Sequence, residues 1–201
     1  MVGYVQAILI GKPLWVTNMK CSWVYAIGYQ PDPTVSIESM KEVGSSWGSW
    51  QTWRACSTDN VICDELGKSR ELINRAFQAV CNFYVPRNNY QKLSRPVGLK
   101  FYESENNEDI QDIDDIISCH LGSANSDIVL LCGFDFSIDP NITDKMELHR
   151  LKNRHGAIRS VIANSSAQWV AIDYDKEIDE NYQNLPNFTC DSMESVLNLL
   201  V

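Results

Sequence analysis

The sequence has no run of about 18 consecutive apolar residues, so it offers no candidate for a membrane-spanning helix. It also lacks both common phosphate-binding loops, since neither G-x-G-x-x-G nor G-x-x-x-x-G-K-[ST] occurs. The histidines and cysteines form no H-E-x-x-H, H-x-H or C-x-x-C spacing, so we predict no metal site of the zinc type. No sequence motif therefore marks a functional site, and the candidate residues are those at the ends of predicted strands and in predicted loops.

The composition is that of one globular domain. The chain has 201 residues, of which 44% are hydrophobic and 21% charged, and we predict a single α/β domain over residues 1–201. Residues 1–10 are apolar but contain no Lys or Arg, so we expect a strand there rather than a signal peptide. No membrane partner is expected.

Seven cysteines are scattered through the chain, and an odd number without close pairs is not typical of a disulfide framework. Several fall inside predicted strands or helices, where a free cysteine behaves as a small apolar residue. We therefore predict reduced thiols and a cytoplasmic location. The cysteines are Cys21, Cys56, Cys63, Cys81, Cys119, Cys132 and Cys190.

The charge is negative overall and unevenly distributed. A net charge of −9 disfavours nucleic acid as a partner. The stretch from Lys68 to Arg95 is nevertheless basic, because only Glu71 opposes its cations, and the stretch from Glu103 to Asp115 is acidic. The basic stretch fits either the phosphates of a small ligand or a solvated helix face, and both interpretations stay open.

The first 35 residues have the pattern of strands. Tyr4–Ile10 is an apolar run, Leu14–Thr17 follows a Gly-Lys-Pro turn, and Ser22–Tyr29 is rich in Trp and Tyr. Such closely spaced strands predict an antiparallel extension at residues 1–35.

From Asn60 onward, short apolar strands alternate with amphipathic helices. This order predicts a single-layered, mainly parallel sheet flanked by helices, the Rossmann-like type of α/β fold. Ile128 to Cys132 is apolar on both faces, as a central parallel strand requires. The predicted strands are 60–63, 97–102, 127–134, 168–172 and 188–190, and the predicted helices are 65–83 and those beginning near 109, 144 and 193.

Three of the predicted strands end at an aspartate, namely Asp64, Asp135 and Asp173. Ligands bind outside the carboxyl ends of strands in open α/β sheets, so these carboxylates are candidate site residues. Asp135 and Asp173 are the candidates for catalysis, and Asp64 is a candidate for ligand binding. Alternatively, each of the three caps a following helix or turn.

A glycine- and serine-rich stretch, Gly44 to Ser49, is the nearest approach to an anion-binding loop. The hydroxyl groups of Ser45 and Ser46 are candidate ligand-binding groups there. A turn that merely begins a helix would have the same composition, so this alternative stays open.

Three tryptophans follow at a spacing of three residues, and Arg54 comes directly after the last. On a helical turn Trp47, Trp50 and Trp53 would share one face. Trp50 and Arg54 would then form a stacking wall and a phosphate contact for a ligand. The alternative is that the tryptophans pack in the core, as large aromatic side chains commonly do.

The segment Asp127-Ile-Val-Leu-Leu-Cys-Gly-Phe-Asp-Phe-Ser137 resembles the strand-to-loop segment of bacterial sialyltransferase-like and motility-associated glycosyltransferase-like proteins. The resemblance implies a nucleotide-sugar site near Asp135. The chain, especially Gly44 to Asp64, also looks similar to uncharacterised proteins of marine tailed phages. That resemblance would imply a location in the host cytoplasm or the virion.

Two functions fit these observations. The first is a small-molecule-binding protein that acts on a nucleotide or nucleotide-sugar, with the three aspartates at the sheet edge and Arg54, Ser45 and Ser46 meeting phosphate. The second is a non-enzymatic interaction or structural protein, such as a phage component, that uses the α/β fold as a scaffold. The residues identify neither a cofactor nor an oligomeric state.

The cysteines give a direct test of the predicted compartment. Thiol titration in denaturant without reductant should find seven reactive groups per chain, because no disulfide framework is expected. A titre below seven in freshly purified protein would contradict the prediction of reduced thiols.

Overall fold

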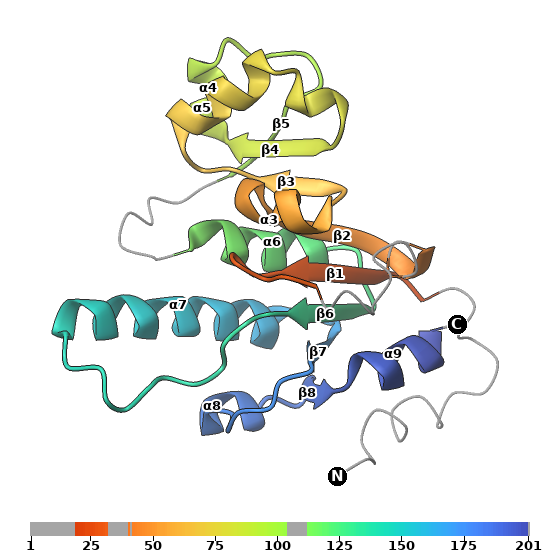
Figure 1. The fold of residues 1–201 in the computed structure, drawn as a ribbon, viewed down its shortest axis with the longest axis vertical. Helices are drawn as coiled ribbons and strands as arrows, with labels where there is room; N and C mark the ends of the chain where they lie inside the picture. Colours follow the sequence, from red (N-terminus) through yellow and green to blue (C-terminus); the bar gives the residue numbers. More distant parts are fainter. Residues whose placement is uncertain (1–18, 32–39, 41, 104–111, 201) are drawn as a thin grey trace.

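A computed structural model describes residues 19–31, 40, 42–103 and 112–200 of the chain. Its centre is one sheet of eight strands in the order β5-β4-β3-β2-β1-β6-β7-β8 (Figure 1). All seven neighbouring pairs are parallel, so the carboxyl ends of the strands lie along one edge of the sheet. The α/β class and the parallel sheet are therefore as predicted.

The strands are β1 Cys21–Tyr25, β2 Gly44–Ser49, β3 Asn60–Ile62, β4 Asn82–Pro86, β5 Lys100–Tyr102, β6 Ile128–Cys132, β7 Gln168–Ile172 and β8 Phe188–Asp191. The helices are α3 Trp50–Cys56, α4 Leu66–Asn74, the 3-10 helix η2 Phe77–Ala79, α5 Arg87–Lys92, α6 Ile113–Ser123, α7 Lys145–Asn164, α8 Glu180–Gln183 and α9 Met193–Leu200.

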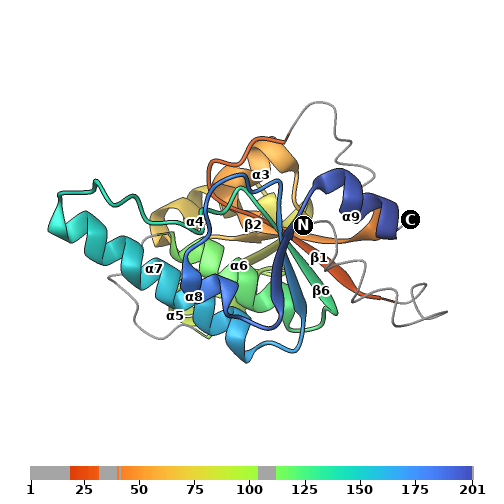
Figure 2. The ribbon, with the colours of Figure 1, turned by 90° about the horizontal axis from the view of Figure 1, so that it is seen from below.

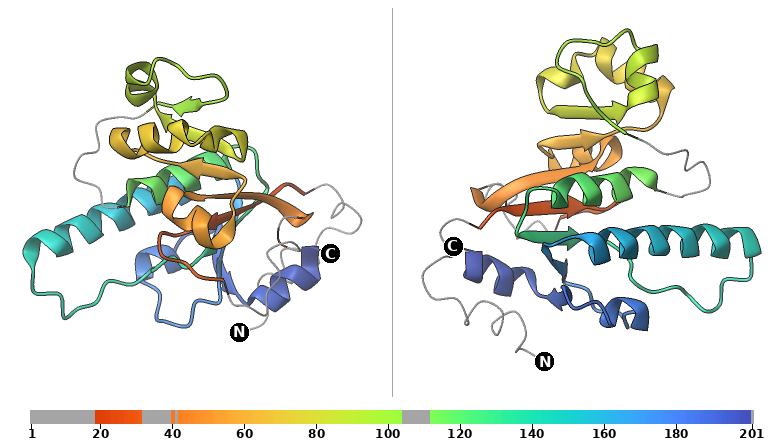
Figure 3. Two further views of the ribbon diagram at one scale, coloured as in Figure 1. Left: turned by 45° about the horizontal axis from the view of Figure 1, so that its top comes forward. Right: turned by 180° about the vertical axis from the view of Figure 1, so that it is seen from behind.

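Helices cover both faces of the sheet (Figure 2). Ile116 of α6 and Ile158 of α7 pack against Val129 and Leu131 on one face. On the other face Met193 of α9 packs with the alternate residues of β6 and β7. Figure 3 shows α6 lying across β1 and β2, next to the middle of the sheet. Because both faces are covered, the central strands are apolar on both sides.

The predicted central strand is confirmed. Val129 and Leu130 are fully buried and Leu131 is 1% exposed. The long helix predicted from Asp144 is also present as α7, and the Asp144 carboxylate accepts hydrogen bonds from the N–H groups of Met146 and Glu147. Local signals, an apolar run and a helix cap, were sufficient for both elements.

The predicted antiparallel extension is wrong in the part that the structure describes. Ser22–Tyr29 was expected in this antiparallel extension, but Cys21–Tyr25 is the central strand β1, parallel to β2 and β6. The runs at 4–10 and 14–17 lie outside the described residues. Short spacing along the chain had favoured a meander, whereas β1 pairs with a strand more than a hundred residues away. Burial of Trp23 and Tyr25 between two layers explains why a strand so rich in aromatic residues is central.

Two further boundaries differ from prediction. Gly44–Ser49 is strand β2 and not a loop. The helix predicted over 65–83 ends at Asn74, and residues 82–86 form β4, which the apolar pattern did not separate from the helix. Ala76 has a φ of 55°, a left-handed conformation that ends the helix before η2.

The loops after β1 and β6 touch each other. Gly133 follows β6 with a φ of 75°, and a Cβ atom at this position would lie 2.7 Å from the Tyr29 ring. Tyr29 in turn stacks on Tyr25, with ring centroids 5.5 Å apart. Gly133 therefore provides both the left-handed conformation and the space that Tyr29 occupies.

Replacing Gly133 by Ala should destabilise the protein by about 2–5 kcal/mol, because left-handed strain of about 1–2 kcal/mol adds to a steric clash. Gly28→Ala is the matched control. Gly28 also has a positive φ, 84°, but nothing lies within 4 Å of its added Cβ atom, so only the strain applies. Urea unfolding of both variants measures the difference, and equal losses would show that the contact with Tyr29 is unimportant.

Candidate functional site

The strand order places a crossover between β1 and β6. After β1 the chain builds the sheet outward through β2 to β5, and then it returns to β6 on the other side of β1. The connection after β1 packs Met40 against one face, whereas α7, which follows β6, packs on the opposite face. Adjacent strands whose connections leave on opposite faces open a crevice at their carboxyl ends, the usual ligand site of such sheets.

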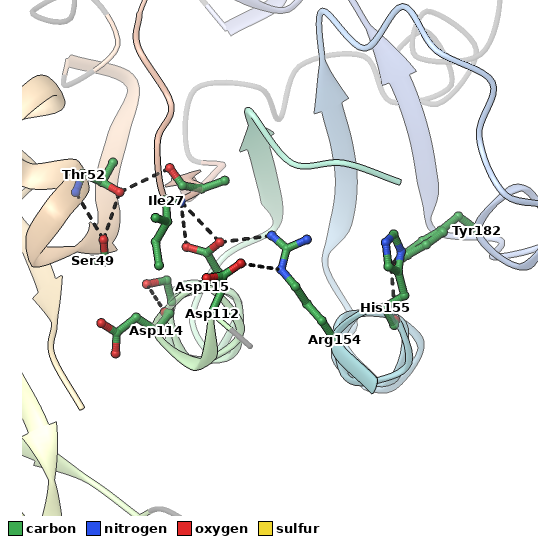
Figure 4. Close-up of polar contacts among 11 residues, drawn as sticks. Ile27, Ser49, Thr52, Asp112, Asp114, Asp115, Arg154, His155 and Tyr182 are labelled. Carbon is green, nitrogen blue, oxygen red and sulfur yellow. Dashed lines mark hydrogen bonds and ion pairs between the residues drawn. The ribbon is translucent and has the colours of Figure 1, made fainter. Parts of the chain in front are cut away.

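Asp115 lies in the first turn of α6, next to Ile27 in the loop after β1 (Figure 4). Its side chain is fully buried, and its two oxygens accept the Ile27 N–H at 3.0 and 3.3 Å. The oxygen Oδ2 also accepts from Nη2 of Arg154 at 3.1 Å. One carboxylate thus joins α6, the loop after β1 and the middle of α7.

Arg154 is itself buried, with its side chain 8% exposed. Its Nε lies 3.5 Å from the Asp112 carboxylate, an ion pair without a hydrogen bond. The guanidinium also lies 5.9 Å from the Phe134 ring, in the loop after β6. Arg154 therefore contacts groups on both sides of the crossover.

Asp114, which precedes Asp115 in α6, makes a similar contact with the backbone just beyond β3. Its Oδ1 accepts the N–H of Asp64 at 3.1 Å, and the Asp64 carbonyl accepts from the side-chain amide of Asn89. Two consecutive carboxylates of α6 therefore bind the backbone just beyond the ends of β1 and β3. This arrangement holds two carboxyl-edge loops at a fixed distance from one helix.

The pKa values of Asp64, Asp114 and Asp115 are all raised above the ordinary value of an aspartate. Burial raises the pKa of Asp115 to about 7, although the Arg154 guanidinium acts in the opposite direction. Burial raises the pKa of Asp114 well above its ordinary value, and the neighbouring charge of Asp64 raises it further. Burial and the charge of Glu65 raise the pKa of Asp64. Perturbed carboxyl groups at a sheet edge are candidates for acid–base chemistry.

The first turn of α3 is hydrogen-bonded to the backbone just beyond the end of β1. The Ser49 hydroxyl accepts the N–H of Thr52 at 3.2 Å and so caps α3. The Thr52 hydroxyl donates to the Ala26 carbonyl, just beyond β1, at 3.2 Å. The end of β1 is therefore held by side chains from two different helices.

His155 is a buried polar residue on α7. Its Nδ1 lies 3.1 Å from the Tyr182 hydroxyl, which also donates to the His155 carbonyl. Burial and the neighbouring Arg154 lower the pKa of His155, so the ring is neutral at physiological pH. Its contacts join α7 to α8.

Asp135 lies in the loop after β6 and has several partners. Its carboxylate accepts from the N–H and the hydroxyl of Ser137, from the Tyr174 hydroxyl at 3.0 Å and from Nζ of Lys176 at 2.9 Å. Burial opposes ionisation, but these donors together lower the pKa of Asp135 to about 2. It does not cap α7, because Asp144 does.

Asp173 follows β7 in a left-handed conformation, with a φ of 50°. Its carboxylate accepts the N–H of Met193 at 2.9 Å and so caps the first turn of α9. Asp135 and Asp173 are therefore at the same edge of the sheet, on neighbouring strands. Their side chains contact different partners, Lys176 and Met193 respectively.

The structure does not bring Ser45 and Ser46 to this edge, which corrects the predicted phosphate loop. Both lie near the amino end of β2, opposite Ser22 and Trp23 of β1. The Ser46 hydroxyl is buried and donates to Asp59 at 2.7 Å. The interpretation as a loop failed because the small polar residues of this stretch find hydrogen-bond partners inside the fold, which the composition alone does not reveal.

The stretch 44–48 also fits the G-x-S-x-G pattern of a nucleophile elbow. In an elbow the serine is exposed at a sharp strand-to-helix turn. Ser46 is instead inside β2 and 1% exposed, with Asp59 as its partner. The pattern is therefore not an elbow in this fold.

The three tryptophans do not share a face, so this prediction is also corrected. Trp47 is in β2 and packs toward α6, whereas Trp50 and Trp53 are in α3 and pack in the cluster around Val61. Arg54 is exposed and lies 5.5 Å from the Trp50 ring. Trp50, the first residue of α3, therefore contacts Arg54 just beyond the carboxyl end of β2, and its ring also packs in the cluster around Val61.

Asp114, Asp115 and Arg154 were missed in the sequence because each signal was weak. The two aspartates looked like part of an acidic stretch. Arg154, however, lies three residues after Leu151 and four before Ile158, within the apolar stripe of α7. A charged residue at a buried helical position is a signal for a buried partner.

The described residues contain neither a metal-ligand cluster nor a membrane-spanning helix. No three His, Cys, Asp or Glu side chains among residues 19–31, 40, 42–103 and 112–200 could hold a metal ion together. Over the same residues, no helix is both long and apolar enough to cross a membrane.

The wholly parallel sheet with helices on both faces makes this an α/β protein of the Rossmann-like type. No protein-family model, no curated protein and no solved structure matches the chain. The glycosyltransferase-like resemblance therefore depends on residues 127–137 alone.

Asp115→Ala should destabilise the protein by about 3–5 kcal/mol at neutral pH, because Arg154 would stay buried without its nearest carboxylate. The double variant Asp115→Asn with Arg154→Met is the matched control. It should recover much of the loss, since both charges are removed together. Urea unfolding provides the measurement, and a single variant as stable as the parent would contradict the structural role of the pair.

The raised pKa values also predict how stability depends on pH. Asp114 and Asp115 bind protons more tightly when folded than their usual value of 3.8 implies, so stability should fall as pH rises from about 4 to 7. Asp114→Asn keeps an acceptor for the Asp64 N–H but cannot ionise, so it should weaken this fall. Asp114→Ala should weaken it equally while being less stable at every pH. Unchanged pH dependence in both variants would contradict the prediction.

Proposed function

We propose that the chain binds a small molecule at the carboxyl edge of its sheet, between the loops after β1 and β6, and that the ligand is a nucleotide or nucleotide-sugar. The observation that carries the proposal is the crossover between β1 and β6 in a wholly parallel sheet.

A glycine at the crossover supports backbone contact with a ligand. Gly28 is exposed and has a positive φ. Nothing lies within 4 Å above the Cα of Gly28 in the direction of a side chain, so a ligand can approach the backbone there. The Ile27 N–H is already bound by Asp115, which holds this loop in one conformation before any ligand arrives.

The aspartates have different roles in this proposal. Asp64 is exposed, and burial and the charge of Glu65 raise its pKa, so its carboxyl group is the candidate for exchanging a proton with a ligand hydroxyl. Asp135, with a pKa of about 2, stays ionised and serves as a hydrogen-bond acceptor. Asp173 follows β7 at the same edge of the sheet. Ser45 and Ser46 are not included, because they lie near the amino end of β2. Trp50 and Arg54 are not included, because the Trp50 ring packs in the cluster around Val61 and contacts the Arg54 guanidinium.

The resemblance of residues 127–137 to glycosyltransferase-like proteins supports the choice of ligand. These residues include β6 and the start of the loop that carries Asp135. A resemblance that falls on one side of the crossover favours a nucleotide-sugar over an unrelated small molecule.

A second candidate function is a non-enzymatic interaction protein. The observation that favours it is the first part of α7, which extends beyond the ends of the strands in Figure 1. Met146 in this part is 64% exposed. An exposed apolar side chain on a projecting helix suits contact with another protein.

A screen with nucleotides and nucleotide-sugars separates the two. Thermal shift should identify a ligand, and titration calorimetry should then show that Asp64→Asn and Asp135→Asn each weaken binding about tenfold, since each removes a charged hydrogen-bond partner. Glu42→Gln, at the amino side of β2, is the control and should bind as the parent does. No ligand in the screen, or full affinity in both aspartate variants, would contradict the proposal.

A further inference from the structure

A second cleft lies at the far end of the sheet, between α5 and the edge strand β5. It has a volume of about 310 Å³. β5 is four positions from β1 in the strand order, so this cleft is separate from the crossover. Its lining residues are Arg87, Tyr90, Gln91, Arg95 and Phe101.

Aromatic side chains form one side of the cleft. The rings of Tyr90 and Phe101 have centroids 5.1 Å apart and an interplanar angle of 36°. Phe101 is 42% exposed, although it is a large apolar residue. The pair therefore leaves an aromatic surface open toward the cleft.

Arg87 is held in place beside these rings. Its guanidinium carbon lies 4.7 Å from the centroid of the Phe101 ring, and Nε donates to Glu103 at 2.6 Å. Glu103 is mostly exposed, so solvent weakens its attraction. Arg87 is thus oriented by two contacts and stays about half exposed.

Arg95 is the second cation and lies just after α5. The Arg95 N–H donates to the Tyr90 carbonyl and the Ser94 N–H donates to the Gln91 carbonyl, the two bonds of a Schellman motif. Ser94 and Arg95 both have positive φ, 63° and 55°. Among the ion pairs of the described residues, none involves Arg95. Its guanidinium is therefore available to an anion.

Other charges near the cleft are mostly positive. Lys92 is in the last turn of α5, and Lys100 precedes Phe101 in β5. Lys100 is 3.4 Å from the Tyr84 hydroxyl and 5.2 Å from its ring, so it points along the sheet. Glu103 is the acidic residue in contact with the lining. On a chain with a net charge of −9, this is a local basic site.

We propose that the cleft binds a nucleoside monophosphate, with Arg95 and Arg87 contacting the phosphate and Tyr90 and Phe101 contacting the base. Guanidinium groups bind phosphate through paired hydrogen bonds, and aromatic side chains stack on any base. The volume is at the lower limit for small-molecule sites, which suits a mononucleotide. The negative net charge disfavours a nucleic-acid strand. This site is independent of the ligand proposed at the crossover.

A ligand series tests which parts of the nucleotide are recognised. Inorganic phosphate, ribose 5-phosphate and adenosine monophosphate should be titrated in turn, by calorimetry or by NMR shifts. Adenosine monophosphate should bind about tenfold more tightly than ribose 5-phosphate, because only it has a base to stack. Equal affinities for the three would overturn the aromatic part of the proposal.

Two variants with a control locate the binding. Arg95→Gln should weaken adenosine monophosphate and ribose 5-phosphate about tenfold each, because both carry the phosphate. Phe101→Leu should lower the affinity for adenosine monophosphate to that for ribose 5-phosphate. Arg75→Gln removes an exposed arginine outside the cleft and should change neither affinity. Circular dichroism melts confirm that each variant folds.

The outcomes also separate this site from the crossover. Loss of binding in Asp64→Asn with full affinity in Arg95→Gln would place the nucleotide at the crossover and overturn the proposal for the cleft. Full affinity in Asp64→Asn with loss in Arg95→Gln and Phe101→Leu would support it. An acidic peptide that displaces adenosine monophosphate and binds more tightly would make the cleft a protein contact and overturn the proposal.

Discussion

The contact of Asp115 with Arg154 and the Ile27 N–H is the interaction on which the centre of this fold depends. It joins the first turn of α6, the middle of α7 and the end of β1, three elements on either side of the crossover. Removing two charges from water is costly, so such a pair is stable only when both groups are hydrogen-bonded and close. Asp115 satisfies this condition with a backbone donor and a guanidinium. The contact therefore anchors the loop after β1 to α6 and α7 beside the junction of β1 and β6.

Asp114 makes a similar hydrogen bond to the backbone just beyond β3, so two buried carboxyl groups of α6 lie near this edge of the sheet. Asp64 and Asp114 lie close together, and burial and the charges of neighbouring carboxylates raise the pKa of both groups. The other end of the sheet differs, because Arg87 and Arg95 stand beside exposed aromatic rings. An acidic crevice and a basic, aromatic cleft thus lie at separate places along one parallel sheet. Ligands with different chemistry would suit each.

Some elements of the fold were predicted correctly from local sequence patterns, and others were not. The apolar run 128–132 and the cap at Asp144 were sufficient to predict β6 and the start of α7. Asp64, Asp135 and Asp173 were correctly expected at strand ends, and the possibility that Asp173 is a helix cap was part of that prediction. By contrast, β1 was placed in an antiparallel extension, and β4 was merged with the preceding helix. Ser45 and Ser46 were assigned to a loop, whereas β2 places them at the opposite edge of the sheet.

The sequence by itself determined the α/β class, the strand at 128–132 and the cap of α7, because these follow from residues within a few positions of one another. Only the tertiary structure decided the strand order, the edge to which each loop belongs and the partners of the buried charges. Asp115 and Arg154 are 39 residues apart, and neither has a local partner that would mark it. Their pairing results from the packing of α6 and α7 on the same face of the sheet. Packing of that kind depends on segments distant in the chain, which local periodicity does not encode.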